Sequence, residues 1–297
     1  MKKVRRTKAN IGLKTDPVRF KPDQVKFYIV LFPIFLVMVL PLIYVIFHAF
    51  KPIDELFAYP PKFITLRPTL ANFKKLMSAA DSTNYPVSLY LFNSVFVTMI
   101  TVLATVMMCA STAYVLAKKT FRPAKVIMTI NQFAMMFVPV AVAIPRFIII
   151  KELHLMDTYM VHILPLLAMP VGLFLVKQFV DQIPPSLIEA AQLDGCSDYG
   201  ILFRIVIPII KPALATVSIL SFQAAWNSVD ASQYYITSEK LKTFAYYLSS
   251  LTAVNGTAVS IQGMAAAAVL IMIVPNLLLF VLMQSKVMST VATSGIK

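Results

Sequence analysis

The residue types that catalyse reactions are scarce in this chain. It has three histidines (His48, His154 and His162) and two cysteines (Cys109 and Cys196), and none has the spacing of a metal site. Cys109 lies in an apolar run and Cys196 in a polar segment, so we expect no disulfide. None of the seven glycines is followed by lysine, which excludes a GxxxxGK[ST] phosphate-binding loop. We therefore expect a non-enzymatic protein that binds and positions other molecules, with no metal and no cofactor of its own.

A second set of candidates consists of polar side chains inside long apolar runs. Such groups either bind a neighbouring helix or line a path for a polar solute. An aromatic ring beside amides, as at Trp226 and Asn227, suits a sugar, because the ring packs on the sugar face and the amides pair with its hydroxyls. The candidate path residues are Asn93, Gln132, Gln223, Trp226 and Asn227, and Asn131, His162 and Asn276 share their setting. On the sequence alone, both interpretations remain open.

The strongest local signal is a polar segment between two apolar runs. Pro184 and Pro185 end any helix that arrives from the preceding run. Ser186 and Glu189 have the spacing of a capping box, in which each side chain bonds the main-chain amide of the other. Apolar and small residues then recur at helical spacing as far as Gly195, whose type suits a left-handed helix end. We predict a helix of about eight residues here.

The charge of this segment favours a protein partner. Residues 186–198 contain three carboxylates and no lysine or arginine. A helix that lies on anionic lipid headgroups is normally basic, so a groove on another protein is the better match. Ser197 or Asp198 is expected to cap the helix that follows.

The composition indicates that these residues are held in a membrane protein. Residues of the AVILMFWYC set make up 59% of the 297 positions, charged residues only 13%, and the mean hydropathy is +0.77; soluble domains are nearer 45–50% and 25%. A net charge of +14 would by itself suggest nucleic-acid binding. The basic residues, however, lie at the edges of apolar runs, and nine of them lie in the first 26 positions. We therefore expect no nucleic-acid partner.

Six apolar runs are long enough to cross a bilayer, which takes about 20 residues. They are 27–50, 88–117, 126–145, 158–176, 205–229 and 261–284. Runs this long and unalternating are typical of helices, since the backbone must satisfy its own hydrogen bonds in lipid. The first run is too long for a cleaved signal peptide. We predict an all-α membrane protein of six transmembrane helices, in which the many prolines serve either local packing or bends along a path.

The distribution of lysine and arginine predicts the orientation. With the N-terminus inside the cell, 18 of these residues lie inside and nine outside, as the positive-inside rule requires. Both termini are then cytoplasmic. The segment 51–87 lies outside, where it forms a small cap, a surface for an external partner or a plain connector.

The loop also resembles the signature of a known family. Glu189-Ala190-Ala191, three residues, Gly195, nine residues and then Ile205-x-Ile207-Pro208 have the spacing of the "EAA" motif of ABC importer permeases. Leucine is usual in that family where Ile207 stands. The resemblance covers about residues 85–290 and extends to stretches typical of the carbohydrate-uptake (maltose-type) branch: Asn93-Ser94, 113–117, 179–194, 212–215 and Trp226-Asn227. The acidic residue that often follows Trp-Asn in the family is replaced here by Ser228.

The resemblance implies a fold, a function and partners. It implies a type I ABC importer permease fold in the cell membrane, for a sugar delivered by an extracellular binding protein, with a second permease and two ATPase subunits that bind ATP and Mg²⁺. The implied organisation is a basic tail 1–26, a first helix 27–50, an extracytoplasmic loop 51–87, a transmembrane domain 88–285 with a coupling loop 178–204, and a tail 286–297. The implied ATPase-coupling residues are Ser186, Glu189, Ala190, Ala191, Asp194 and Gly195.

Three alternatives remain on the sequence. An ion-driven secondary transporter normally has ionisable groups within its spans and internal repeats, whereas no Asp or Glu lies centrally in any of the six runs. An ABC permease for a non-sugar solute would share the loop motif. A membrane receptor or assembly factor would also present a loop for a partner.

Overall fold

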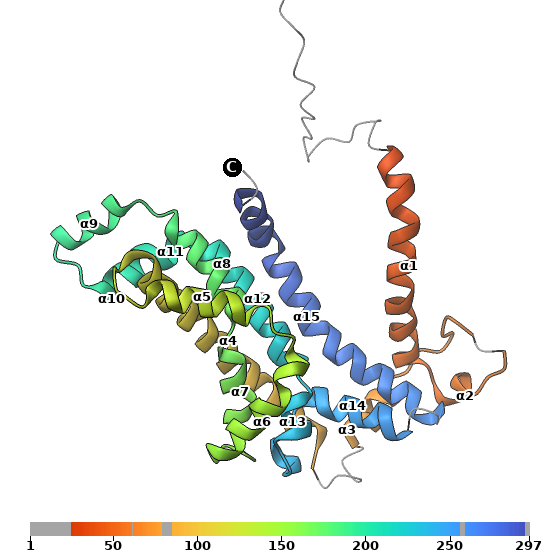
Figure 1. Cartoon of the computed structure of the whole chain (residues 1–297). Coiled ribbons are helices and arrows are strands. Elements are labelled where there is room, and N and C mark those ends of the chain that lie inside the picture. Colours follow the sequence, from red (N-terminus) through yellow and green to blue (C-terminus); the bar gives the residue numbers. More distant parts are fainter. Residues whose placement is uncertain (1–24, 61, 79–84, 256–258, 295–297) are drawn as a thin grey trace, which may run out of the picture. The chain divides into compact units, whose positions relative to one another are not determined.

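The computed structural model describes residues 25–60, 62–78, 85–255 and 259–294, and within these ranges every regular element is a helix (Figure 1). The predicted all-α class is confirmed. The tail residues 1–24 and Lys297 lie outside the described residues. The chain divides into two compact units, residues 1–44 and 45–297.

The described part of the first unit belongs to helix α1, Val25–Phe50. Its 26 residues are almost all apolar and include Pro33 and Pro41. At 1.5 Å per residue the helix is about 39 Å long, which exceeds the roughly 30 Å of a hydrocarbon core. It corresponds to the predicted first span.

Two long helices run through the second unit. They are α4, Val87–Lys118, and α15, Val259–Ser294, and they correspond to the predicted second and sixth spans. Helix α12, Lys211–Trp226, packs against both of them. α4 also packs against α7, Met160–Leu167, and α8, Pro170–Asp181. α4 is therefore the central helix of this unit.

The third predicted span, 126–145, is not one straight helix. α5 ends at Ala134, and a short 3₁₀ turn, Pro139–Val142, leads into α6, Ala143–Glu152, at an angle of 111°. Pro139 has no amide hydrogen to continue a helix and holds Val138 in an extended conformation, with φ −76° and ψ 135°. α5, Ala124–Ala134, is only ~16 Å long. Pro139 therefore bends this span, which is one of the two roles that the sequence left open for its prolines.

The fourth and fifth predicted spans are also bent. α7 and α8 meet at 45°, where Met169 precedes Pro170 and leaves the helical region. The segment 198–209 meets α12 at 84°, at Ile210. Pro212 lies in the first turn of α12, where its missing amide costs no hydrogen bond. In the described chain, three helices can cross a membrane alone, and there are six spans when each bent pair counts as one.

The second unit has a large apolar core at each end. One core joins α4, α8, α12 and α9, Pro185–Leu193; we call this the α9 end. The other joins α4, α12, α15 and α14, Phe244–Asn255, at the α14 end, where α13, Asp230–Tyr234, also lies (Figure 1). The two candidate sites of the chain lie at these two ends.

Candidate functional site

Helix α9 is the predicted helix of the polar loop, but it starts differently from the prediction. It begins at Pro185, with extended Pro184 before it and no side-chain cap, so the predicted Ser186–Glu189 capping box is not formed. Proline suits the first helical position because its φ is already helical and the amide it lacks would have no partner there. Ser186 then falls one position inside the helix, too late to cap it.

The end of α9 is as predicted. Gly195 has a φ of +77° and donates its amide to the Gln192 carbonyl at 3.0 Å, while the Cys196 amide bonds the Ala191 carbonyl at 2.9 Å. These two bonds form a Schellman motif, which requires a left-handed residue at this point. A side chain at Gly195 would meet no atom within 4 Å, so the requirement for glycine is conformational rather than steric.

A second short helix follows at once. Ser197 accepts a hydrogen bond from the Gly200 amide at 3.3 Å and caps α10, Asp198–Ile201. A π-helical turn, Leu202–Val206, and α11, Ile207–Ile209, then lead to α12. α9 is thus held between two sharp, locally determined turns.

One face of α9 is buried and the other faces outward. Ile188 and Ala191 belong to the core of the α9 end, whereas Leu193 is 89% exposed. Tyr199, just after α9, is 78% exposed. The predicted loop residues Ser186, Glu189, Ala190, Asp194 and Gly195 are also exposed, and Ala191 is buried. An apolar surface of this kind on a rigid short helix is suited to binding another protein.

Side chains at the C-terminal end of α4 tie both ends of this loop to the central helix. Lys118 donates from Nζ to the Ile183 carbonyl at 2.6 Å, before α9. Lys119 Nζ lies 2.6 Å from Asp198 Oδ1, after α9, and the Tyr114 hydroxyl donates to the same oxygen at 3.2 Å. The Lys119 hydrogen bond is the main reason that the pKa of Asp198 lies below its ordinary value.

Two of the candidate path residues have packing roles. Asn93 is fully buried; its Nδ2 donates to the Lys240 and Lys242 carbonyls at 2.9 Å each, and its Oδ1 accepts from Tyr159 at 2.8 Å. Trp226 is buried between α12 and α15, where Nε1 donates to the Met272 carbonyl at 3.1 Å. Both side chains serve contacts between elements of this chain.

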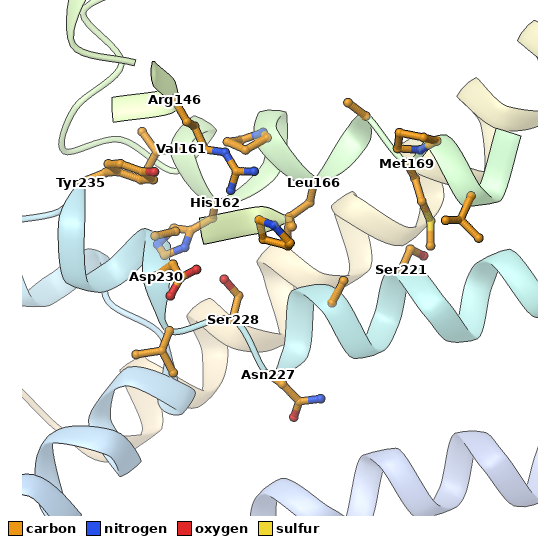
Figure 2. Close-up of a pocket in the computed structure, with 18 residues that line it drawn as sticks. Arg146, Val161, His162, Leu166, Met169, Ser221, Asn227, Ser228, Asp230 and Tyr235 are labelled. Atoms are coloured by element: carbon orange, nitrogen blue, oxygen red, sulfur yellow. The ribbon is translucent and has the colours of Figure 1, made fainter. Parts of the chain in front are cut away.

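The other candidates are closer to a surface. Gln132 and Gln223 are exposed. Asn227 is exposed as well, and in Figure 2 its side chain points away from the other labelled residues. Its Oδ1 accepts from Asn276 of α15 at 3.5 Å. Of the residues with the same setting, Asn131 donates to the Pro170 carbonyl at 3.0 Å and His162 bonds the Leu241 carbonyl at 3.1 Å.

A cavity of about 560 Å³ lies near the α14 end, between α6, α7, α12 and α13. Figure 2 shows Arg146, His162 and Asp230 directed toward one another from three of these elements. Ser228 and Tyr235 add hydroxyl groups to the lining. Of the residues singled out from the sequence, His162 and Asn227 line this cavity, whereas Arg146 and Asp230 lie just beyond the third and fifth apolar runs, where no local pattern signals a site.

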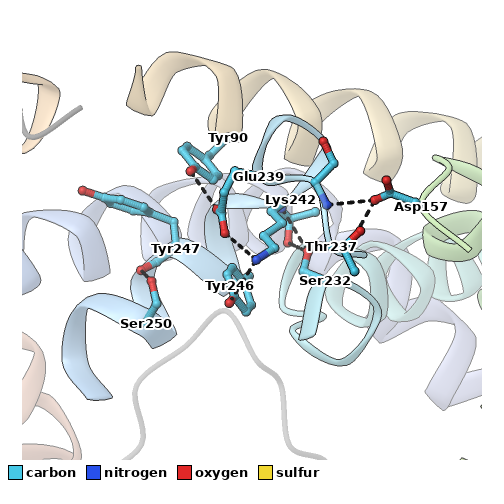
Figure 3. Close-up of polar contacts among 11 residues, drawn as sticks. Tyr90, Asp157, Ser232, Thr237, Glu239, Lys242, Tyr246, Tyr247 and Ser250 are labelled. Atoms are coloured by element: carbon cyan, nitrogen blue, oxygen red, sulfur yellow. Dashed lines mark hydrogen bonds and ion pairs between the residues drawn. The ribbon is translucent and has the colours of Figure 1, made fainter. Parts of the chain in front are cut away.

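The segment 237–243 closes the α14 end and is held almost entirely by side chains that bond its main chain. Asp157 accepts from the Thr237 and Ser238 amides at 3.1 and 2.9 Å, and Ser94 accepts from the Phe244 amide at 2.8 Å. Tyr90, Glu239, Lys242 and Tyr246 form a hydrogen-bonded series beside it (Figure 3). The segment is thereby fixed in one conformation against α4 and α7.

Across the described ranges, no three His, Cys, Asp or Glu side chains are close enough to hold a metal ion. What the two ends provide is an outward-facing short helix at one and a cavity with both apolar and polar lining residues near the other.

Comparisons with known proteins agree on one family. Residues 107–285 match the family described as "Binding-protein-dependent transport system inner membrane component". The sulfoquinovosyl glycerol transport system permease protein SmoH of Agrobacterium fabrum is 29% identical over 86% of this chain and 88% of its own length. The polygalacturonan/rhamnogalacturonan transport system permease protein YtcP of Bacillus subtilis is 34% identical over 68% of each chain.

A solved structure shares the fold. A chain in the crystal structure of a bacterial ABC transporter involved in the import of the acidic polysaccharide alginate matches with a TM-score of 0.74 and 22% identity. The match covers 90% of this chain and 98% of that one.

Proposed function

Since the chain belongs to the family of binding-protein-dependent transport system inner membrane components, we propose that it is the permease subunit of an ATP-driven importer for an oligosaccharide or glycoside. The relatives above are named for the transport of sulfoquinovosyl glycerol and of polygalacturonan or rhamnogalacturonan. The chain itself carries out no covalent chemistry in this role. Its work is to open a path to one side of the membrane at a time.

The observation that carries the proposal is the construction of α9. The helix is short, ends in a Schellman turn at Gly195 and presents Leu187 and Leu193 outward while Ile188 and Ala191 are packed in the core. A helix held in this way can transmit a push without deforming. We assign it as the coupling helix that docks on an ATPase subunit, with Ser186, Glu189, Ala190, Ala191, Asp194 and Gly195 as its coupling residues.

We place the ATPase on a separate chain. The sequence has no phosphate-binding loop of the GxxxxGK[ST] type, so ATP and Mg²⁺ are bound by the partner. The complete assembly then contains two ATPase subunits, a second permease subunit and an extracellular binding protein that delivers the sugar.

The orientation follows from the charge distribution. We place both termini and α9 in the cytoplasm, because this arrangement puts most lysine and arginine residues inside. The α14 end then faces the exterior. The ATPases bind at one end of the permease and the binding protein at the other.

The cavity near the α14 end is the candidate entry point for the sugar. Arg146, Asp230 and Ser228 offer hydrogen-bond donors and acceptors for hydroxyl groups, and the exposed amides of Gln132 and Gln223 extend the polar surface along α5 and α12. In this proposal Asn93 and Trp226 support the path by holding its walls together.

The first test is to purify the tagged chain in mild detergent and to identify the proteins that accompany it. We expect an ATPase with a phosphate-binding loop and a second permease with its own Glu-Ala-Ala loop. Reconstituted with its binding protein, the assembly should take up sugar only when ATP is supplied. Uptake that continues without ATP but stops with an uncoupler would overturn the proposal in favour of an ion-driven carrier.

A further inference from the structure

The segment between α1 and α4 buries two of its charged side chains and exposes several large apolar ones. Inside it lie Lys51, 1% exposed, and the similarly buried Glu55 and Thr65. Its outside carries Tyr59, 96% exposed, and Leu66, 70% exposed. Other large apolar residues on its outside include Ile53, Phe57, Ile64 and Leu70. A group of exposed large apolar side chains marks a surface that contacts something other than water.

Hydrogen bonds hold the buried Glu55 in place. Glu55 accepts from the Thr65 hydroxyl at 2.8 Å and from the Leu66 amide at 3.3 Å. The Thr65 bond is the largest contribution that lowers the pKa of Glu55. Arg67 pairs with Asp54 and lies 3.6 Å from Glu55. These contacts satisfy the polar groups of the loop within the loop itself.

The base of the segment is fixed to the membrane helices. Asn72 of α3, Ala71–Ser78, donates to the Ala49 and Lys51 carbonyls at 3.0 and 2.8 Å. A Cβ at Gly263 of α15 would come within 2.7 Å of the Asn72 side chain, so only glycine allows this contact. The Thr69 amide also bonds the Phe50 carbonyl at 2.8 Å. The apolar residues between these points are therefore held in place close to the ends of membrane-crossing helices.

Location and charge identify the surrounding medium. Residues 51–86 join the end of one membrane helix to the start of the next, so they must lie at the surface of the bilayer. The exposed charged side chains of residues 51–78 are four basic ones and one acidic one: Lys62, Arg67, Lys74, Lys75 and Asp54. Aromatic and aliphatic residues beside basic ones are the composition of surfaces that enter the headgroup region of anionic lipid.

We propose that the outer apolar surface, formed by Ile53, Phe57, Tyr59, Ile64, Leu66 and Leu70, is inserted into the headgroup region of the bilayer and prefers anionic phospholipid. The segment then acts as an anchor at the membrane surface and fixes the depth of α15 and α4 in the bilayer. The inference does not depend on the proposed transport function, because it concerns only the medium around this loop.

Photo-crosslinking in intact cells tests the proposal with all natural partners present. p-Benzoylphenylalanine is introduced at Tyr59 and, in a second variant, at Leu66; the exposed Lys240 of the segment 237–243 is the matched control position. After irradiation the purified chain is weighed by mass spectrometry. We expect phospholipid adducts at Tyr59 and Leu66 at least about fivefold above Lys240, with anionic headgroups enriched over their share of the membrane.

Three results would overturn the proposal. The first is lipid adducts at Tyr59 and Leu66 no more abundant than at Lys240. The second is crosslinks mainly to a protein, which would make the surface a subunit or binding-protein contact. The third is adducts that follow the membrane composition without enrichment, which would remove the preference for anionic lipid. Transport measured in the same variants reports separately on the proposed function.

Discussion

The two ends of the second unit each have an apolar core, but they differ in the polar contacts that accompany it. At the α9 end, apolar side chains of α4, α8, α9 and α12 share one core, and Tyr114, Lys118 and Lys119 tie the loop to the end of α4. At the α14 end, buried polar side chains bind main-chain groups directly, as Asn93 binds the Lys240 and Lys242 carbonyls. Apolar packing has no preferred direction, whereas hydrogen bonds do.

This difference suggests a division of roles. The α9 end can shift as a body while its core stays packed, which suits a part that receives a push. The α14 end is fixed in a single geometry and suits a part that must present a constant surface. The predictions below test this contrast, beginning with the change of largest expected effect.

Replacing Asn93 by leucine should damage the α14 end most. The change leaves two buried carbonyls and the Tyr159 hydroxyl without their partner, at a cost of about 2–4 kcal/mol. The measurement is the free energy of unfolding of the detergent-solubilised assembly. Gln132→Leu, at an exposed amide of α5, is the control and should cost less than about 0.5 kcal/mol. Equal losses of unfolding free energy in the two variants would show that the Asn93 hydrogen bonds do not hold the α14 end in place.

Gly195→Val should damage the α9 end through backbone conformation alone. A φ of +77° costs a side-chain-bearing residue about 1–2 kcal/mol, enough to lower the population of the correct loop roughly tenfold. We expect uptake to fall by a similar factor while membrane insertion is unchanged. Gly195→Asn, which tolerates this conformation better, should retain more activity. Equal uptake by all three proteins would contradict a role for this turn.

Ser197→Ala tests which serine caps a helix. Loss of the bond to the Gly200 amide should cost about 0.5–1 kcal/mol and speed hydrogen exchange at Gly200 and Ile201. Ser186→Ala is the matched control, because Ser186 makes no cap in the structure, and it should leave exchange at the start of α9 unchanged. Faster exchange at the start of α9 in Ser186→Ala would show that Ser186 does cap this helix.

Loss of the Lys119–Asp198 contact should change stability least of the four changes, and the pH dependence of stability is the way to detect it. Because the pKa of Asp198 is lowered in the folded protein, its contribution to stability is complete above the unfolded pKa and is lost as the pH falls through the folded one. Carboxyl ¹³C NMR, with Asp198→Asn for assignment, should give a midpoint below the ordinary value for aspartate. Lys119→Met should move the midpoint upward. An unchanged midpoint would show that Lys119 does not hold this end of the loop.

The sequence predicted the α9 end far better than the α14 end. The turns at Gly195 and Ser197 depend on hydrogen bonds between groups three to five residues apart, so local rules describe them. Asn93 acts on Lys242, 149 positions along the chain, and no local pattern signals that contact. The same holds for Arg146 and Asp230, which only the fold brings to one cavity.

The bends in the spans could be predicted from the sequence only in part. Pro139, Pro170 and Pro212 were visible in the sequence, and each lies at a break. Pro33 and Pro41, by contrast, lie within the unbroken helix α1. Whether a proline breaks a span depends on what packs beside it, and the sequence does not contain that information directly.

The break after α5 has a consequence for the life of the protein in the cell. α5 rises only ~16 Å before the non-helical residues 135–138, so this stretch lies near the middle of the membrane, and Met136 and Phe137 are exposed in the single chain. Irregular backbone at that depth persists only against protein or water, not lipid. In the assembly proposed above, a second permease subunit would cover this break, and a copy of the chain made without that subunit would expose irregular backbone that membrane proteases recognise. On that proposal, the abundance of this chain should follow the supply of the second subunit.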